Sequence, residues 1–287
     1  MIPGRFTYHR PSSVGEAVKL LASLGEDARP LAGGHSLIPM MKLRLAQPEH
    51  LVDLGKIGGL KGIRQDGTEI VIGAMTTQAE ILGSVLLREK APILGEAAQV
   101  IADPQVRYLG TIGGNVANGD PGNDMPGLMQ CLDARYVLTG PGGSRQVAAR
   151  DFYEAAFFTK LQPGEIVTEI RFAAPAAGHG WAYEKLKRKV GDYAVAAAAV
   201  TLTVSGGKCA NASIALTNVA QTPLLAADAA KALVGTSLDQ AAIDAAAKAA
   251  MAISNPTTDT RGPVEYRRSV LGVMVRRAIA RAKSRAR

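Results

Sequence analysis

Cysteine is scarce in this sequence, which has only Cys131 and Cys209 among its 287 residues. Two cysteines cannot supply the four thiolates of an iron–sulfur cluster, and they make a disulfide framework improbable. We therefore expect a reducing, cytoplasmic location, with association at the inner face of the cytoplasmic membrane left open.

Long apolar runs are lacking as well. The longest, residues 194–200, is far shorter than the roughly 18 consecutive apolar residues that a membrane span requires. The first five residues contain no apolar segment of the kind found in secretory leaders. We expect neither a transmembrane helix nor a cleaved leader.

Aromatic residues make up only 5% of the chain and do not alternate with basic residues, which disfavours nucleic-acid binding. The net charge is +8, but six basic residues and no acid lie in the tail Arg276–Arg287. This tail could be a solvated helix end, where the helix dipole favours cations, or a docking surface for an acidic partner or an anionic membrane.

Several motifs that carry chemistry are also missing. Residues 110–114 read GTIGG, so no G-x-G-x-x-G fingerprint is present, and neither a phosphate-binding P-loop nor a G-x-S-x-G elbow occurs. The four histidines show no metal-ligand spacing. The pattern argues against a Rossmann or P-loop fold and leaves a bound organic cofactor as the expected source of chemistry.

Strand-like and helix-like patterns are mixed along the chain, with hairpins in place of regular βαβ units, which predicts an α+β fold. The composition shifts at residues 173–178, where we place a linker between two domains. The predicted elements are strands 28–31, 51–54, 135–139, 146–148 and 166–172, helices 37–45, 223–234, 238–253 and 264–287, and hairpins 63–73 and 195–219.

The first candidate site is Ala32-Gly33-Gly34-His35-Ser36, between a predicted strand and a predicted helix. Glycines without a Cβ allow neighbouring backbone amides to point inward together and form an anion-binding nest. The alternative is a tight turn that simply needs a positive φ. Taken alone, this motif leaves both interpretations open.

The second candidate, Thr111-Ile112-Gly113-Gly114-Asn115, has the same character and lies in a glycine-rich and asparagine-rich segment, residues 110–127. We predict this segment to be a long functional loop, because connectors of that length are uncommon. Two such loops could grip the diphosphate of a dinucleotide from both sides. Two unrelated turns remain the alternative.

Two further candidates follow. Asp124 could accept hydrogen bonds from a ribose or an adenine, or it could cap the helix that runs through Gln130. The basic run 185–189, followed by Tyr193, could be a solvated face. It could also border a cleft between domains, where Lys185 would stabilise negative charge on a reduced cofactor and Tyr193 would lie against an aromatic ring.

At these motifs the sequence resembles the medium, flavin-binding subunits of the molybdenum hydroxylase (xanthine dehydrogenase) family, and the resemblance covers essentially the whole chain. Three stretches, residues 32–54, 111–132 and 183–194, are most similar to the aerobic carbon monoxide dehydrogenase branch of that family. The paired glycine loops are specific to the superfamily, whereas the branch assignment rests on overall similarity.

The resemblance implies a vanillyl-alcohol-oxidase-type (PCMH-type) FAD-binding domain over residues 1–177, with two α/β subdomains at about 1–57 and 58–177. A C-terminal domain, residues 178–287, would hold a small antiparallel sheet and helices. FAD would be the only cofactor of this chain. The implied partners are a small subunit with two [2Fe–2S] clusters and a large molybdopterin subunit that oxidises carbon monoxide at a Mo/Cu site, in a dimer of heterotrimers. Electrons would pass through FAD to a quinone or another respiratory acceptor.

The resemblance also implies roles for individual residues. Ala32 to Ser36 and Thr111 to Asn115 would line the diphosphate, with His35 contributing only its backbone. Asp124 would lie on the adenosine side, Lys185 near the flavin ring, and Val167 (or Ile166) at an apolar contact. Tyr193 is our own candidate for packing near the isoalloxazine.

Three other functions compete with this one. The chain could belong to a related molybdenum hydroxylase that acts on an aldehyde or an N-heterocycle. It could be a free-standing flavin dehydrogenase, although the sequence offers no clear catalytic base. It could also be a non-catalytic scaffold that uses its basic tail.

Overall fold

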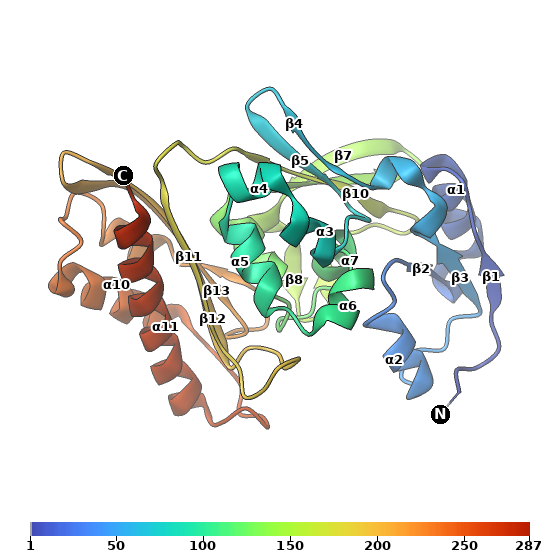
Figure 1. The fold of residues 1–287 in the computed structure, drawn as a ribbon. Coiled ribbons are helices and arrows are strands. Elements are labelled where there is room, and N and C mark those ends of the chain that lie inside the picture. Colours follow the sequence, from blue (N-terminus) through green and yellow to red (C-terminus); the bar gives the residue numbers. More distant parts are fainter. Residues whose placement is uncertain (1) are drawn as a thin grey trace.

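A computed structural model describes residues 2–287 (Figure 1). Three larger sheets follow one another along the chain, together with one two-stranded sheet. The N-terminal sheet is parallel, with strand order β1-β3-β2. Its first helix begins after Ser13, whose hydroxyl accepts a hydrogen bond from the amide of Glu16, and it ends at Gly25 with φ near +60°. The elements are β1 (Thr7–His9), α1 (Val14–Leu24), β2 (Ala28–Leu31), α2 (Leu37–Lys42) and β3 (His50–Asp53).

The second sheet has five antiparallel strands in the order β4-β5-β10-β6-β7. The predicted hairpin at residues 63–73 is confirmed, and Gly67 supplies the positive φ of its turn. The strands are β4 (Ile63–Asp66), β5 (Glu69–Gly73), β6 (Arg135–Gly140), β7 (Gly143–Ala148) and β10 (Ile166–Ala173), with a small side ribbon of β8 (Tyr153–Ala155) and β9 (Phe158–Thr159).

Six short helices connect β5 to β6. They are α3 (Gln78–Gly83), α4 (Val85–Lys90), α5 (Ile93–Val100), α6 (Pro104–Leu109), α7 (Ile112–Ala117) and α8 (Asp124–Cys131). The prediction of one long loop over residues 110–127 is therefore wrong, because α7 and the start of α8 occupy much of it. Glycine has a low helix propensity, but tertiary packing overrides that preference in both helices.

The C-terminal sheet is antiparallel, with strand order β11-β12-β13-β14. Both glycines of the predicted turn, Gly206 and Gly207, have positive φ, which confirms that hairpin. The predicted helix over residues 223–234 is wrong at its start, where a two-residue strand comes before a shorter helix. The elements are β11 (Gly180–Leu186), β12 (Ala196–Ser205), β13 (Lys208–Thr217), β14 (Leu224–Leu225), α9 (Ala227–Lys231), α10 (Gln240–Ile253) and α11 (Val264–Arg285).

Helices cover both faces of this C-terminal sheet. α11 packs on one face, while α5 and α8 of the preceding helical layer pack on the other. Side chains of β12 alternate between the two faces. Ala196, Ala198 and Val200 join the core under α11, whereas Ala197 and Ala199 join the core on the side of α5 and α8. Alanine suits this strand because its small side chain lets helices approach from both sides.

The basic tail is largely engaged within the molecule. Glu96 on α5 accepts hydrogen bonds from Arg281 at 2.6 Å and from Arg285 at 2.8 Å, and Arg281 also pairs with Glu184. The guanidinium of Arg285 lies 3.7 Å from the ring centroid of Trp181. These contacts fix the end of α11 against α5 and β11, an arrangement that none of the tail interpretations anticipated.

The predicted α+β class is confirmed. The division after residue 177 stays a prediction; β10 ends at Ala173 and β11 begins at Gly180, while a single core cluster includes residues from both sides. No helix among residues 2–287 combines the length and the apolar character needed to cross a bilayer.

Candidate functional site

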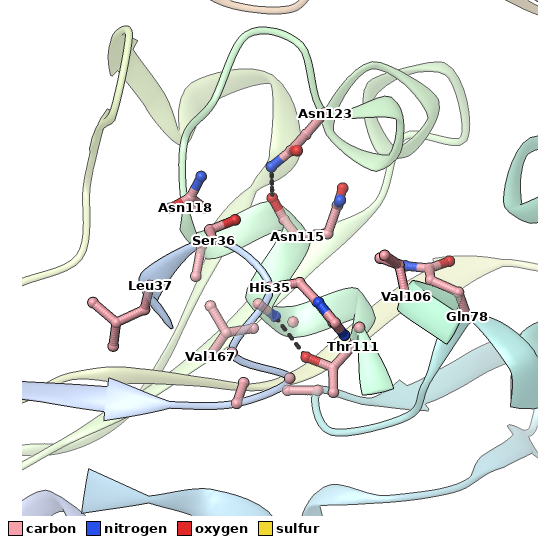
Figure 2. A pocket seen from close by; sticks show the side chains of 18 of the residues that line it. His35, Ser36, Leu37, Gln78, Val106, Thr111, Asn115, Asn118, Asn123 and Val167 are labelled. Carbon is pink, nitrogen blue, oxygen red and sulfur yellow. Dashed lines mark hydrogen bonds between the residues drawn. The ribbon is translucent and has the colours of Figure 1, made fainter. Parts of the chain in front are cut away.

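A cavity of about 490 Å³ opens between the N-terminal unit, helices α6 to α8, and the end of β11 (Figure 2). Its size and its mixture of apolar and polar walls are typical of sites for organic ligands. All the predicted site residues except Ile112 line it. Ile112 is fully buried in the core beneath the cavity.

The first glycine loop, residues 32–36, connects β2 to α2 and forms one wall of the cavity. Gly34 has φ near +74°, as a turn of this kind requires. Within residues 2–287, the backbone amides of Gly33, Gly34, His35 and Ser36 have no hydrogen-bond acceptor. These amides are available to an anionic ligand.

The two glycine loops touch each other. A Cβ built on Gly33 would overlap the carbonyl oxygen of Leu109 and come within 2.8 Å of the Cα of Gly110. On the other side of the contact, a Cβ on Gly114 would lie 3.4 Å from that of Ala32. The two glycine loops thus lie next to each other, as the sequence pattern suggested. This close approach requires glycine at position 33.

The second loop differs from the prediction in its conformation. Thr111 caps α7, because its hydroxyl oxygen accepts a hydrogen bond from the Gly114 amide at 3.1 Å. The amides of Ile112 and Gly113 donate to the carbonyls of Thr76 and Ala74. The predicted nest of free amides is therefore wrong for this loop, because the protein itself satisfies them.

The second loop lines the cavity with its glycine backbone and with the polar side chains of Thr111 and Asn115. A Cβ on Gly113 would lie 2.5 Å from that of Ala74, so only glycine lets α7 pack this closely on the end of β5. The carboxamide oxygen of Asn115 accepts a hydrogen bond from the Met125 amide, and its backbone carbonyl accepts one from Asn123 (Figure 2). These bonds fix the α7–α8 connection along the cavity.

Asp124 and Lys185 meet at one end of the cavity. The Lys185 ammonium donates to Asp124 Oδ2 at 2.7 Å, and the Tyr183 hydroxyl donates to Asp124 Oδ1 at 2.6 Å. The sequence-based assignment placed Asp124 on the adenosine side and Lys185 near the flavin, and it did not anticipate this direct contact; both roles stay predictions. The two side chains therefore lie at the same end of the cavity.

Strand β11 explains why Lys185 is buried, which the solvated-face interpretation did not allow. Side chains alternate along the strand, and Trp181, Tyr183 and Lys185 all point toward the helical layer. Burial, followed by the negative charge of Asp124, raises the pKa of Tyr183 far above its usual value. Sequence reasoning missed Tyr183, although the period-two alternation of residues 181–186 could have indicated it.

Tyr193 borders the same end of the cavity. Its ring lies over the chain at Gly122, where a Cβ would come within 2.7 Å of the ring, and the Arg261 guanidinium lies 5.5 Å from its centroid. Burial and the nearby Asp120 carboxylate raise the pKa of the Tyr193 hydroxyl to about 12. Tyr193 therefore presents an uncharged phenol at neutral pH, which is compatible with the predicted packing role.

One lining residue was not anticipated at all. Gln78, the first residue of α3, is 2% exposed, and neither polar atom of its carboxamide has a hydrogen-bond partner within residues 2–287. Buried amides without partners are rare in proteins. Gln78 lies between Thr77 and Glu80, which form a capping box at the start of α3.

The residues present fit an FAD molecule. The free amides of the first loop could hold a diphosphate, and glycine at positions 33 and 113 lets the backbone segments that form the cavity wall pack closely together. Two sequence families cover nearly the whole chain: residues 4–175 match the FAD binding domain in molybdopterin dehydrogenase, and residues 181–282 match the CO dehydrogenase flavoprotein C-terminal domain.

The chain belongs to the FAD-binding medium subunits of the molybdenum hydroxylases. A carbon monoxide dehydrogenase medium chain from Afipia carboxidovorans is 66% identical to this flavin subunit, over 100% of this chain and 99% of that one. The corresponding chain from Hydrogenophaga pseudoflava is 51% identical, over 99% of each. The crystal structure of a cyanide-inactivated Cu,Mo-CO dehydrogenase contains a chain with a TM-score of 0.99 and 66% identity, with complete coverage of both chains.

Proposed function

We propose that this chain is the FAD-carrying, electron-transferring medium subunit of a Cu,Mo carbon monoxide dehydrogenase. The observation that carries the proposal is the row of unpaired amides at residues 33–36, held against the second glycine loop by the Gly33–Leu109 contact. Similarity to carbon monoxide dehydrogenase medium chains over the full length of both chains supports the choice of substrate system.

Within this subunit, the amides of Gly33 to Ser36 would hold the diphosphate of FAD. The second loop would position the cofactor through the Thr111 hydroxyl, the Asn115 side chain and close backbone contact. Val167, which is 5% exposed, would supply an apolar contact. Lys185, Asp124 and Tyr193 would surround one end. Bound FAD supplies a centre that takes up two electrons and releases them to a different acceptor.

The oxidation itself would take place on a partner. We propose a small subunit with two [2Fe–2S] clusters as the electron donor to this chain, and a large molybdopterin subunit with a Mo/Cu site where carbon monoxide becomes carbon dioxide. A dimer of such heterotrimers and a quinone or other respiratory acceptor complete the proposal. Because Arg281 and Arg285 are engaged with Glu96, the tail has fewer free cations for membrane or partner docking than its charge suggests.

The test uses the natively expressed complex, from which the flavin is removed. Carbon monoxide should still reduce the iron–sulfur clusters, as followed by their absorption and paramagnetic resonance, while electron delivery to the acceptor stops. Re-addition of FAD should restore that delivery. Unchanged acceptor reduction without flavin would refute the electron-transfer role, and an active lone chain would favour a free-standing flavin dehydrogenase.

A further inference from the structure

The buried carboxamide of Gln78 is unsatisfied within the described protein. Its Nε2 and Oε1 atoms lack any hydrogen-bond partner there, although the residue lies on the wall of the cavity beside Val106 (Figure 2). Leaving both a donor and an acceptor of one buried side chain unpaired is unfavourable for folding. If this position served folding alone, an apolar side chain would be more stable here than glutamine.

The backbone holds this side chain in place. Gln78 is the first residue of α3, between the two capping-box residues Thr77 and Glu80, and its own amide donates to the carbonyl of Gly110 at 2.9 Å. Thr77 also forms an isolated β-bridge with Thr111. The backbone at Gln78 is therefore anchored at the start of the second glycine loop before any ligand binds, so its side chain begins from a fixed point on the cavity wall.

The chemistry of a carboxamide restricts what can satisfy it. Its nitrogen donates and its oxygen accepts, so a full partner must offer an acceptor and a donor side by side. Phosphate oxygens accept only and would leave Oε1 unpaired. α3 packs against α5 and α6, and the cavity wall next to them is formed by Ile101, Ala102 and Val106. Such apolar walls suit a flat ring better than a sugar.

We propose that the Gln78 carboxamide binds the polar edge of a heteroaromatic ring of FAD, donating through Nε2 and accepting through Oε1. This inference rests on the proposed function, because it requires FAD in the cavity. Both rings of FAD carry such an edge: the isoalloxazine has an N–H next to a carbonyl, and the adenine has an amino group next to a ring nitrogen. Gln78 would then be a residue that positions the cofactor.

The experiment compares Gln78→Leu with Gln105→Leu in the assembled complex. Gln105 is an exposed glutamine on α6 that does not line the cavity, which makes it a matched control. Flavin-depleted complexes are titrated with FAD, with FMN and with ADP, and the flavin reduction potential is measured after loading. Gln78→Leu should raise the Kd for FAD roughly ten- to hundredfold, while Gln105→Leu leaves it unchanged.

The probes distinguish the two rings. Weaker FMN binding with a shifted potential would place Gln78 at the isoalloxazine, whereas weaker ADP binding with an unchanged potential would place it at the adenine. FAD affinity and potential that both stay at wild-type values in Gln78→Leu would overturn the inference while leaving the proposed function intact. A wild-type complex with no affinity for FAD would overturn both.

A second variant covers the case in which leucine disturbs folding. Gln78→Glu preserves the size of the side chain but replaces the donor with an acceptor, so it should also weaken FAD binding. Melting of the FAD-free full-length chain serves as the folding readout. Gln78→Leu should melt no lower than wild type without FAD, because it removes two unsatisfied buried groups.

Discussion

Asp124 and Lys185 form a buried ion pair at one end of the cavity, with their side chains 5% and 1% exposed and 2.7 Å between Oδ2 and Nζ. The pair connects α8 to β11 and so joins the helical layer to the C-terminal sheet. Tyr183 and the carbonyl of Val100 complete the hydrogen bonding around it. Both charges are thereby compensated before any ligand enters.

Removing one partner of this pair should therefore be costly. Asp124→Leu leaves the Lys185 charge buried and uncompensated, and we expect the free energy of unfolding to fall by about 3–5 kcal/mol. The double variant Asp124→Leu/Lys185→Met should lose less than the sum of the two single variants. Urea denaturation of the full-length chain measures these values. Asp133→Asn, which breaks the exposed pair with Arg150, is the control and should cost at most about 1 kcal/mol.

Gly33 should tolerate no side chain. Gly33→Ala forces the two glycine loops apart at Leu109 and Gly110, so the amides of the first loop lose their position. We expect at least an approximately tenfold loss of FAD affinity, which corresponds to roughly 1.4 kcal/mol. The flavin content of the purified complex measures it. Gly95→Ala places a Cβ in open space on α5 and should retain flavin; equal flavin content in both variants would argue against the loop contact.

The Glu165–Arg145 pair predicts an acid-dependent loss of stability. Hydrogen bonding from Arg145 lowers the pKa of Glu165 from its usual 4.5, against the opposing effect of burial and with help from the Gln162 amide. A carboxyl whose pKa is lowered on folding stabilises the protein above its unfolded-state pKa, and this contribution is lost as the pH falls through the folded-state value.

The corresponding measurement is the unfolding free energy of wild type and Glu165→Gln between pH 7 and pH 3. The wild-type advantage should be complete near neutral pH and should shrink below about pH 4.5, where the carboxyl becomes protonated in the unfolded chain. Glu154→Gln, at an exposed position on β8, should show no comparable trend. A Glu165 difference that stays constant over this range would refute the assignment.

Glu96 should control how firmly the end of α11 is held. Its carboxylate accepts hydrogen bonds from Arg281, Arg285 and the Tyr183 amide, so Glu96→Gln weakens three interactions at once. We expect a loss of about 1–3 kcal/mol and faster tryptic cleavage after Arg281 and Arg285. Asp244→Asn removes the more exposed partner of Arg276 and should change the cleavage rate much less. Identical cleavage in the two variants would contradict the role given to Glu96.

Features that depend on neighbouring residues could be predicted from the sequence. The strand at residues 28–31 has the predicted bounds, and the hairpins at residues 63–73 and 195–219 follow from glycine turns. In each case the backbone conformation that determines the element depends on only a few neighbouring residues. The family assignment depends equally on local motifs, the two glycine loops, and the comparisons confirm it.

Features that depend on distant partners escaped the sequence. The sequence left open whether Lys185 lies on a solvated face or beside a cleft, and it did not indicate that Lys185 is buried on β11 in an ion pair with Asp124. The glycines at positions 113 and 114 looked like a second nest. Only the hydrogen bonds from α7 to Ala74, Thr76 and Thr111 show that their amides are already used.

The sequence by itself determined the local turns, the alternation of helices and strands, and the family, because each follows from short-range periodicity and from glycine at defined positions. The tertiary structure alone decided that, within residues 2–287, the amides of residues 33–36 and the Gln78 carboxamide at the cavity lack hydrogen-bond partners. The physical reason is that a polar group is hydrogen-bonded only if a partner lies next to it in space. The distance between two residues along the chain does not determine whether they meet in this way.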